Sequence, residues 1–255
     1  MEDKEFRVRK ALGPALGSLA RLDGTLVLSK MRGPLVENIK ANLERSPSAD
    51  EKLVGSTRYS HEAKGEMMHD TEGWRSLDTS VGSFATVLSE AVFSSPSDAV
   101  AQIDEELVGL IEVLALHTNR FVREITFILI EAVFTMARSD KAEQTLQEKQ
   151  LGRLLQIVSE GLADNWSQVR MAASKAVRAY YVLEGIYHSE EAKEAVLVEE
   201  GRYASVLLPR ICLNRRYVAE GVRVYSAQTW KGIVKGRGRK VVAALASDFA
   251  EFYIS

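Results

Sequence analysis

Apolar side chains recur every three or four positions along most of the chain, and the two-residue alternation typical of strands is essentially absent. In residues 97–117, SDAVAQIDEELVGLIEVLALH, this spacing predicts one helix with a single apolar face. Ser97 and Asp98, just after Pro96, are candidates for its N-terminal cap. The apolar positions of this face are Val100, Ile103, Leu107, Ile111 and Leu114. The pattern predicts an all-α fold.

An amphipathic helix, a short polar turn and a more apolar helix follow one another three times. The first pair ends with a helix from about Arg120 to residue 137, and the others cover residues 149–184 and 203–234. We place the start of the second helices at Val122, Val169 and Val218, which lie 47 and 49 residues apart. This regular spacing indicates an internal repeat of helical hairpins.

A short motif marks the turn into the second helix. Its fullest copy has an aspartate, four variable residues, a Val-Arg pair and small residues, as in Asp164, Val169 and Arg170 followed by alanines. Two further copies share this spacing, with histidine replacing the aspartate in the second: Asp3, Val8 and Arg9, and His117, Val122 and Arg123. The hairpin around Val218 departs from the motif, with Leu213 and Ala219 at the Asp and Arg positions. An aspartate there can accept backbone N–H groups, the valine fills the seam, and small residues let helices approach.

This motif and its period resemble the HEAT family of helical repeats. The resemblance implies a right-handed α-solenoid of about five HEAT or armadillo-like hairpins, forming one unit over residues 1–255 with incomplete repeats at both ends. It also implies that Arg9, Arg123 and Arg170 form a ladder with acidic residues of adjacent repeats. The alternative is that these arginines are exposed and bind a ligand. His117 is expected to serve the turn.

Residues 45–69 interrupt this regularity with a polar stretch of mixed charge, RSPSADEKLVGSTRYSHEAKGEMMH. Helical spacing then resumes at Trp74, Leu77, Val81, Phe84 and Leu88. We therefore expect a flexible loop inserted between the two helices of one hairpin. Loops of this length are either functional or disordered, and disorder is the preferred interpretation.

Positive charge is concentrated in residues 201–240, which contain ten Lys and Arg residues and one glutamate, while the whole chain has a net charge of −2. Glycines break the densest part, KGIVKGRGRK, into a turn. The region is a candidate site for an acidic partner, either an acidic protein segment or nucleic-acid phosphates. The alternative is a solvated turn whose charges pair with the next repeat. The candidate residues are Arg215, Arg216, Lys235, Arg237, Arg239 and Lys240.

Motifs for catalysis are missing from the sequence. His61 and His69 are eight residues apart instead of the four that place two ligands on one helical face, and the single Cys212 lies in an apolar context typical of a buried residue. Neither a phosphate-binding loop nor a dinucleotide fingerprint occurs. We therefore predict no catalytic residues, no cofactor and no metal.

The predicted function, by analogy with the family, is a non-catalytic scaffold or adaptor that binds extended or helical segments of other proteins along stacked helices. Nucleic-acid or acidic-ligand binding through residues 201–240 is the alternative, and a subunit or regulatory part of an enzyme complex is less favoured. The sequence has neither a signal peptide nor a long apolar run, so we expect a soluble cytoplasmic or nuclear protein. The last sixteen residues, KVVAALASDFAEFYIS, are expected to form the first helix of a further hairpin, as in a segment of a larger chain or complex.

Overall fold

The computed structural model describes residues 6–43, 72–137, 146–187 and 203–254. Asp3, His61, His69 and the predicted loop at residues 45–69 lie outside these ranges. The described residues form helices and turns and contain no strand, which confirms the all-α prediction. The chain divides into two compact units, Met1–Thr145 and Leu146–Ser255. The single solenoid over residues 1–255 stays a prediction, and each unit is described by itself.

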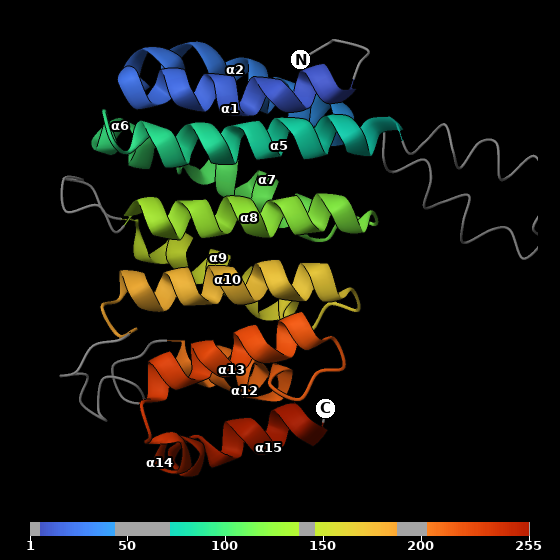
Figure 1. The fold of residues 1–255 in the computed structure, drawn as a ribbon, viewed down its shortest axis with the longest axis vertical. Coiled ribbons are helices and arrows are strands. Elements are labelled where there is room, and N and C mark those ends of the chain that lie inside the picture. Colours follow the sequence, from blue (N-terminus) through green and yellow to red (C-terminus); the bar gives the residue numbers. More distant parts are fainter. Residues whose placement is uncertain (1–5, 44–71, 138–145, 188–202, 255) are drawn as a thin grey trace, which may run out of the picture. The chain divides into compact units, whose positions relative to one another are not determined.

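Unit 1 is built from two layers of helices (Figure 1). One layer contains α1, α5 and α8 side by side, and the other contains α2, α6 and α7. The helices in the described part of this unit are α1 (Phe6–Leu22), α2 (Gly24–Leu43), α5 (Glu72–Ala91), α6 (Pro96–Ala101), α7 (Glu105–Ala115) and α8 (Arg120–Ala137). Because α2 packs against α5, the segment between them connects two helices of the same unit.

The apolar face predicted for residues 97–117 is buried, with all five predicted side chains no more than 4% exposed. The prediction of one continuous helix there is wrong. Helix α6 ends at Ala101 and α7 begins at Glu105, because Asp104 has extended backbone and its side chain accepts a hydrogen bond from the N–H of Leu107 at 2.9 Å. Such a cap stabilises a new helix start. Helix α6 begins at Pro96, so the predicted cap residues lie inside its first turn.

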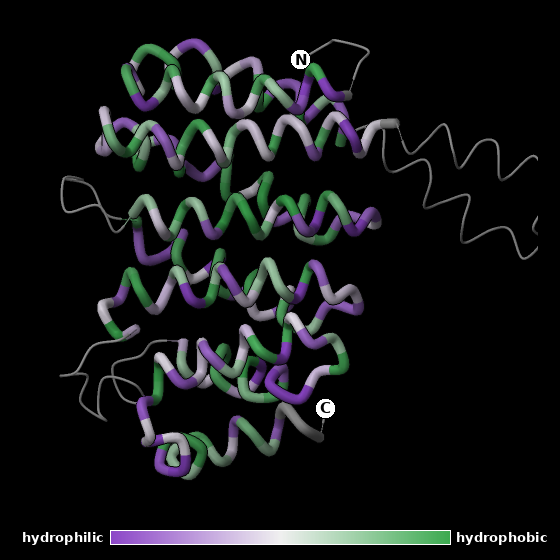
Figure 2. The backbone as a smooth tube through the Cα atoms, viewed as in Figure 1, coloured by the Kyte–Doolittle hydropathy of each residue, from purple (hydrophilic) through white to green (hydrophobic). Residues whose placement is uncertain are grey.

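Helices α5 and α8 form the centre of unit 1. Four of the five expected positions of α5 are fully buried, namely Leu77, Val81, Phe84 and Leu88. The fifth, Trp74, is half-buried and stacks on Phe121 of α8 with 4.9 Å between ring centroids. Helix α8 is hydrophobic along most of its length (Figure 2), with Phe127 and Phe134 among the largest fully buried side chains. This matches the prediction that the second helix of the hairpin is the more apolar one.

Unit 2 repeats the hairpin arrangement. Helix α10 packs on α13, while α9 and α15 both pack on α12. The helices described in this unit are α9 (Glu148–Gly161), α10 (Ser167–Leu183), α12 (Ala204–Asn214), α13 (Glu220–Val234), α14 (Gly238–Ala244) and α15 (Ala246–Ile254). The prediction of one helix at the end of the chain is wrong, because the helix breaks at Leu245. None of the described helices is both long and apolar enough to cross a membrane.

The placement of Val218 at the start of a second helix is also wrong. Helix α13 begins at Glu220, and Val218 is 86% exposed in the turn before it. Val222, which is 1% exposed, takes the buried position held by Val122 and Val169 in the other hairpins. The motif is therefore displaced by four residues, and its Val-Arg pair is Val222 with Arg223.

Candidate functional site

The turns before α8 and α10 use different side chains for the same hydrogen bond. Asp164 Oδ1 accepts from the N–H of Trp166 at 2.8 Å, and His117 Nδ1 accepts from the N–H of Asn119 at 3.0 Å. In both turns the donor lies two residues after the acceptor. An imidazole nitrogen without a proton can accept in place of a carboxylate oxygen. His117 therefore takes part in the turn, at the position where the motif has aspartate.

The arginines of the Val-Arg pairs donate hydrogen bonds to carbonyl oxygens of the turns that precede their helices. Arg123 donates from Nη1 to the carbonyl oxygens of His117 at 2.7 Å and Thr118 at 3.0 Å. Arg223 donates to the carbonyl oxygen of Tyr217 at 3.4 Å. These carbonyls follow the end of the preceding helix, where cationic donors are favourable.

Arg170 makes the most contacts of these arginines and connects two hairpins. It donates to the carbonyl oxygens of Ala163, at 3.0 Å, and Asp164, and its Nη1 donates to Asn214 Oδ1 at 2.8 Å. Asn214 Nδ2 in turn donates to the carbonyl oxygen of Leu162 at 3.0 Å. The resemblance implied an acidic partner for this arginine, but in the adjacent hairpin its guanidinium meets the amide of Asn214 and the ring of Tyr217.

The N-terminal copy of the motif differs from the others. Val122 and Val169 are fully buried, whereas Val8 is 46% exposed and Arg9 is half-buried on α1. Among the described helices, α1 packs on α2 and α5. The described part of unit 1 has no helix over the face that carries Val8, so this valine does not fill a seam there.

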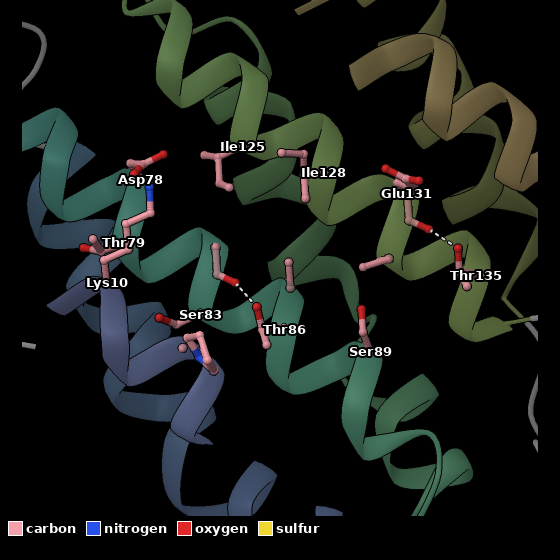
Figure 3. Close-up of a pocket in the computed structure, with 15 residues that line it drawn as sticks. Lys10, Asp78, Thr79, Ser83, Thr86, Ser89, Ile125, Ile128, Glu131 and Thr135 are labelled. Carbon is pink, nitrogen blue, oxygen red and sulfur yellow. Dashed lines mark hydrogen bonds between the residues drawn. The ribbon is translucent and has the colours of Figure 1, made fainter. Parts of the chain in front are cut away.

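A groove crosses α1, α5 and α8 in unit 1 and has a volume of about 530 Å³ (Figure 3). We call it the unit 1 groove. Ile125 and Ile128 of α8 form its apolar wall, and Ile128 is 36% exposed. Helix α5 forms the floor with small side chains, including Ser83 and Thr86. Pro14 of α1 lies on the far side.

Charged side chains lie at the two ends of the unit 1 groove. Lys10 and Asp78 lie at one end and Glu131 at the other (Figure 3). Burial raises the pKa of the Asp78 carboxyl above its ordinary value, and the positive charge of Lys10 opposes part of this rise. The carboxyl group of Asp78 is therefore partly desolvated in the groove, which makes its charged form less stable.

The threonine hydroxyls of the groove are bonded to their own helices. Thr86 Oγ1 donates to the carbonyl oxygen of Gly82 at 2.9 Å, and Thr135 Oγ1 donates to that of Glu131 at 2.8 Å. Such bonds to the preceding turn fix the side-chain rotamer. The threonine hydroxyls therefore donate within their own helices. The strongest polar groups that remain for a ligand are the charged side chains at the two ends of the groove, Lys10, Asp78 and Glu131.

Sequence reasoning did not single out any residue of the unit 1 groove. The signal in the sequence was a set of small residues on α5 at helical spacing, Gly82, Ser83, Thr86 and Ser89, of which Ser83 is buried and the others are half-buried. Alone, such a pattern indicates only close helix packing. The groove depends on residues from three helices far apart in the chain, so its existence follows from the packing.

The cationic residues predicted in unit 2 are only partly brought together. Arg215 and Arg239 line a second groove, of about 560 Å³, and Lys231 joins them there although it was not among the candidates. Arg237 donates from Nε to the carbonyl oxygen of Val234 at 3.3 Å. Neither Arg237 nor the other three candidates line this groove: Arg216 and Lys240 are exposed, and Lys235 is half-buried just after α13.

Among the described side chains, no group of three His, Cys, Asp or Glu residues could hold a metal ion. Cys212 is buried, as its apolar context predicts. No protein-family model, curated protein or solved structure matches the chain. The resemblance to HEAT repeats thus rests on the turn motif and on the pairing of helices into hairpins.

Proposed function

We propose that this chain is a HEAT-type, non-catalytic protein-interaction scaffold, and that the unit 1 groove binds an extended segment of another protein. The observation that carries the proposal is the groove itself, which crosses three neighbouring helices of one layer. At a helix spacing of 8–10 Å, such a crossing is roughly 20 Å long, which matches about six residues of extended chain.

The chemistry of the groove favours a segment with both apolar and donor groups. Ile125 and Ile128 offer aliphatic surface, and burying one aliphatic side chain against such surface contributes about 1.5–3 kcal/mol when the burial is complete. Asp78 offers a carboxylate whose raised pKa reflects lost hydration. A donor from the partner would restore the lost hydrogen bonds. We therefore propose an apolar residue of the partner at Ile128 and a basic or hydroxyl-bearing residue near Asp78.

The cost of holding Asp78 supports a binding role. A partly buried carboxyl group lowers stability at neutral pH, and groups kept at such a cost are concentrated at functional sites. Structural ion-pair networks also perturb pKa values, and Lys10 is close enough to compensate part of the penalty. The groove geometry, with an apolar wall beside this carboxyl, favours the functional interpretation.

The proposal is tested with a matched pair of exposed aliphatic residues in unit 1. Ile128→Arg places a charge on the groove wall, and Val113→Arg places the same charge on α7, in the other layer, where Val113 is 55% exposed. We expect Ile128→Arg to reduce recovery of bound proteins from cells at least about tenfold, as expected for a loss of about 1.4 kcal/mol. Val113→Arg should leave recovery within about twofold.

Thermal unfolding followed by circular dichroism controls for folding of both variants. Equal recovery with Ile128→Arg and wild type, with both folded, would show that the unit 1 groove does not bind the partner.

A further inference from the structure

The second groove, in unit 2, differs in chemistry from the first, and we call it the cationic groove. Arg215 enters it from the end of α12, Trp230 and Lys231 from α13, and Arg239 and Val242 from α14. Its volume is about 560 Å³. Three cations thus surround a space whose other walls include an indole and aliphatic side chains.

A tight turn brings these groups together. Helix α13 ends at Val234, and the next residue, Lys235, has a left-handed φ of 42°, followed by Gly236 with φ of 81°. Two successive residues with positive φ turn the chain sharply, so that α14 begins at Gly238 close to Trp230 and Val234 of α13. A Cβ at Gly238 would lie 3.3 Å from Trp230 Nε1, so the backbone here approaches the indole closely. The glycines of the KGRGRK stretch therefore shape the groove.

The three cations differ in how firmly they are held. Arg215 is fixed, because Nε donates to the carbonyl oxygen of Cys212 at 3.3 Å and its guanidinium lies 4.7 Å from the centroid of the Trp230 ring. Lys231 and Arg239 are exposed and have no ion pair with any residue that the structure describes. Cations grouped beside a low-dielectric wall produce a field that attracts anions.

Trp230 adds a hydrogen-bond donor. The residue is 6% exposed, lines the groove, and its Nε1 lies beside Gly238. Among the described residues Nε1 has no acceptor. An indole nitrogen carries one hydrogen and acts only as a donor. An oxygen of a ligand in the groove would supply the acceptor.

The remaining wall is aliphatic. Val234 is buried, and Val242, on α14, is 36% exposed. An apolar side chain of the ligand can therefore lie against Val242 while its anionic groups meet Lys231 and Arg239. We infer that the cationic groove binds an acidic peptide segment carrying an apolar residue. This inference is independent of the proposal for unit 1, because it concerns another unit and other residues.

The aromatic geometry favours a peptide over nucleic acid. Single-stranded nucleic acids bind by stacking bases on exposed aromatic faces. The ring of Trp230 is covered by the guanidinium of Arg215, and it meets the ring of Phe249 edge to face, with centroids 6.5 Å apart and an interplanar angle of 89°. One face of the ring is therefore covered within the protein, and because Trp230 is only 6% exposed, little of the ring is open for a base to stack on.

The test measures binding of a short fluorescein-labelled peptide of glutamates with a central leucine to the full chain, by fluorescence anisotropy at low salt. The double variant Lys231→Gln, Arg239→Gln should weaken binding about tenfold, because it removes two of the three cations that meet the glutamates. Val242→Ser should weaken binding about threefold. Lys175→Gln, an exposed lysine of α10 in the same unit, should change it less than about twofold.

Control probes distinguish the ligand classes. The peptide with glutamines in place of glutamates should not bind, and the peptide with glycine in place of leucine should bind more weakly. Equal binding by wild type and the double variant, or no binding of the acidic peptide at low salt, would overturn the inference. So would preferential binding of single-stranded oligothymidine, which would assign the groove to nucleic acid. Thermal unfolding of each variant confirms that the cationic groove is tested in a folded chain.

Discussion

Arg170 and Arg223 occupy the same position in successive hairpins, yet the structure holds them to different degrees. Arg170 is half-buried, bonds to its turn and to Asn214 of the next hairpin, and its guanidinium lies 4.3 Å from the centroid of the Tyr217 ring. Arg223 is exposed and makes one long hydrogen bond, also at Tyr217. The arginine of the Val-Arg motif therefore bonds to a turn in each hairpin. How firmly it is held depends on the side chains of the next hairpin that it contacts.

This difference predicts unequal effects of the same substitution. Arg170→Ala leaves the Asn214 side chain and two turn carbonyls without their donor, so we expect the free energy of unfolding to fall by about 2 kcal/mol. Arg223→Ala removes one weak contact and should cost less than about 0.5 kcal/mol. Urea denaturation of the two variants measures the difference. Similar losses for both would mean that the link to Asn214 does not stabilise the fold.

A second residue-scale prediction concerns the pH dependence from Asp78. The pKa of Asp78 in the folded protein lies above the ordinary 3.8. At pH values between 3.8 and the pKa of the folded protein, the folded state therefore binds more protons than the unfolded chain. This contribution to the free energy of unfolding is thus present at low pH and is lost as pH rises through the folded pKa. Asp78→Asn removes the charged form, so its stability relative to wild type should rise from acid to neutral pH.

Urea denaturation over a series of pH values checks this sign. Lys10→Gln serves as a control, since Lys10 opposes the raised pKa: it should destabilise the wild type at neutral pH and have little effect in the Asp78→Asn background. A relative stability that falls with rising pH would contradict the assignment of burial as the dominant cause.

At the element scale, periodicity predicts the helices, while local chemistry decides where they start and stop. The apolar faces of α5 and α7 can be predicted from the spacing of apolar residues alone, because a helix buried along one face needs apolar residues three or four positions apart. The break before α7 depends on one cap, Asp104, which also forms an ion pair with Arg32 of α2. The shift of α13 arises because Val218 and Val222 are one helical turn apart, so both satisfy the same periodicity. Which of the two valines is buried depends on how α13 packs, and the periodic pattern does not determine this.

Close packing of α1 on α5 predicts the effect of an added methyl group. A Cβ at Gly17 would lie 2.8 Å from Thr86 Cγ2, and the hydrogen bond of Thr86 to Gly82 opposes its rotation. Gly17→Ala should therefore destabilise the protein by about 1–3 kcal/mol. Gly33, inside α2, has no atom within 4 Å of such a Cβ, so Gly33→Ala should stabilise by about 0.5–1 kcal/mol.

Urea denaturation again separates these outcomes, with both variants in the same unit. If Gly17→Ala raised the unfolding midpoint as Gly33→Ala should, the close contact between α1 and α5 would be contradicted.

At the scale of the whole molecule, the two units carry grooves of different chemistry. The excess of cations in residues 201–240 is visible in the sequence and leads to Arg215 and Arg239. The part played by Trp230 and Val242 is seen only in the structure, where α13 and α14 line the same groove. The unit 1 groove could not be predicted in this way. Lys10, Asp78 and Glu131 are separated by more than fifty residues from one to the next, and only the packing of three helices brings them to one surface.

The central claim is that the unit 1 groove receives a segment of a partner protein. The most direct measurement places a photo-crosslinking amino acid at Ile128 in one form of the chain and at Val113 in another, and identifies crosslinked peptides by mass spectrometry in cells. We predict that position 128 crosslinks to one continuous partner segment bearing an apolar residue near a basic or hydroxyl-bearing one, and that position 113 does not. No adduct at position 128, or the same adducts from both positions, would contradict the claim.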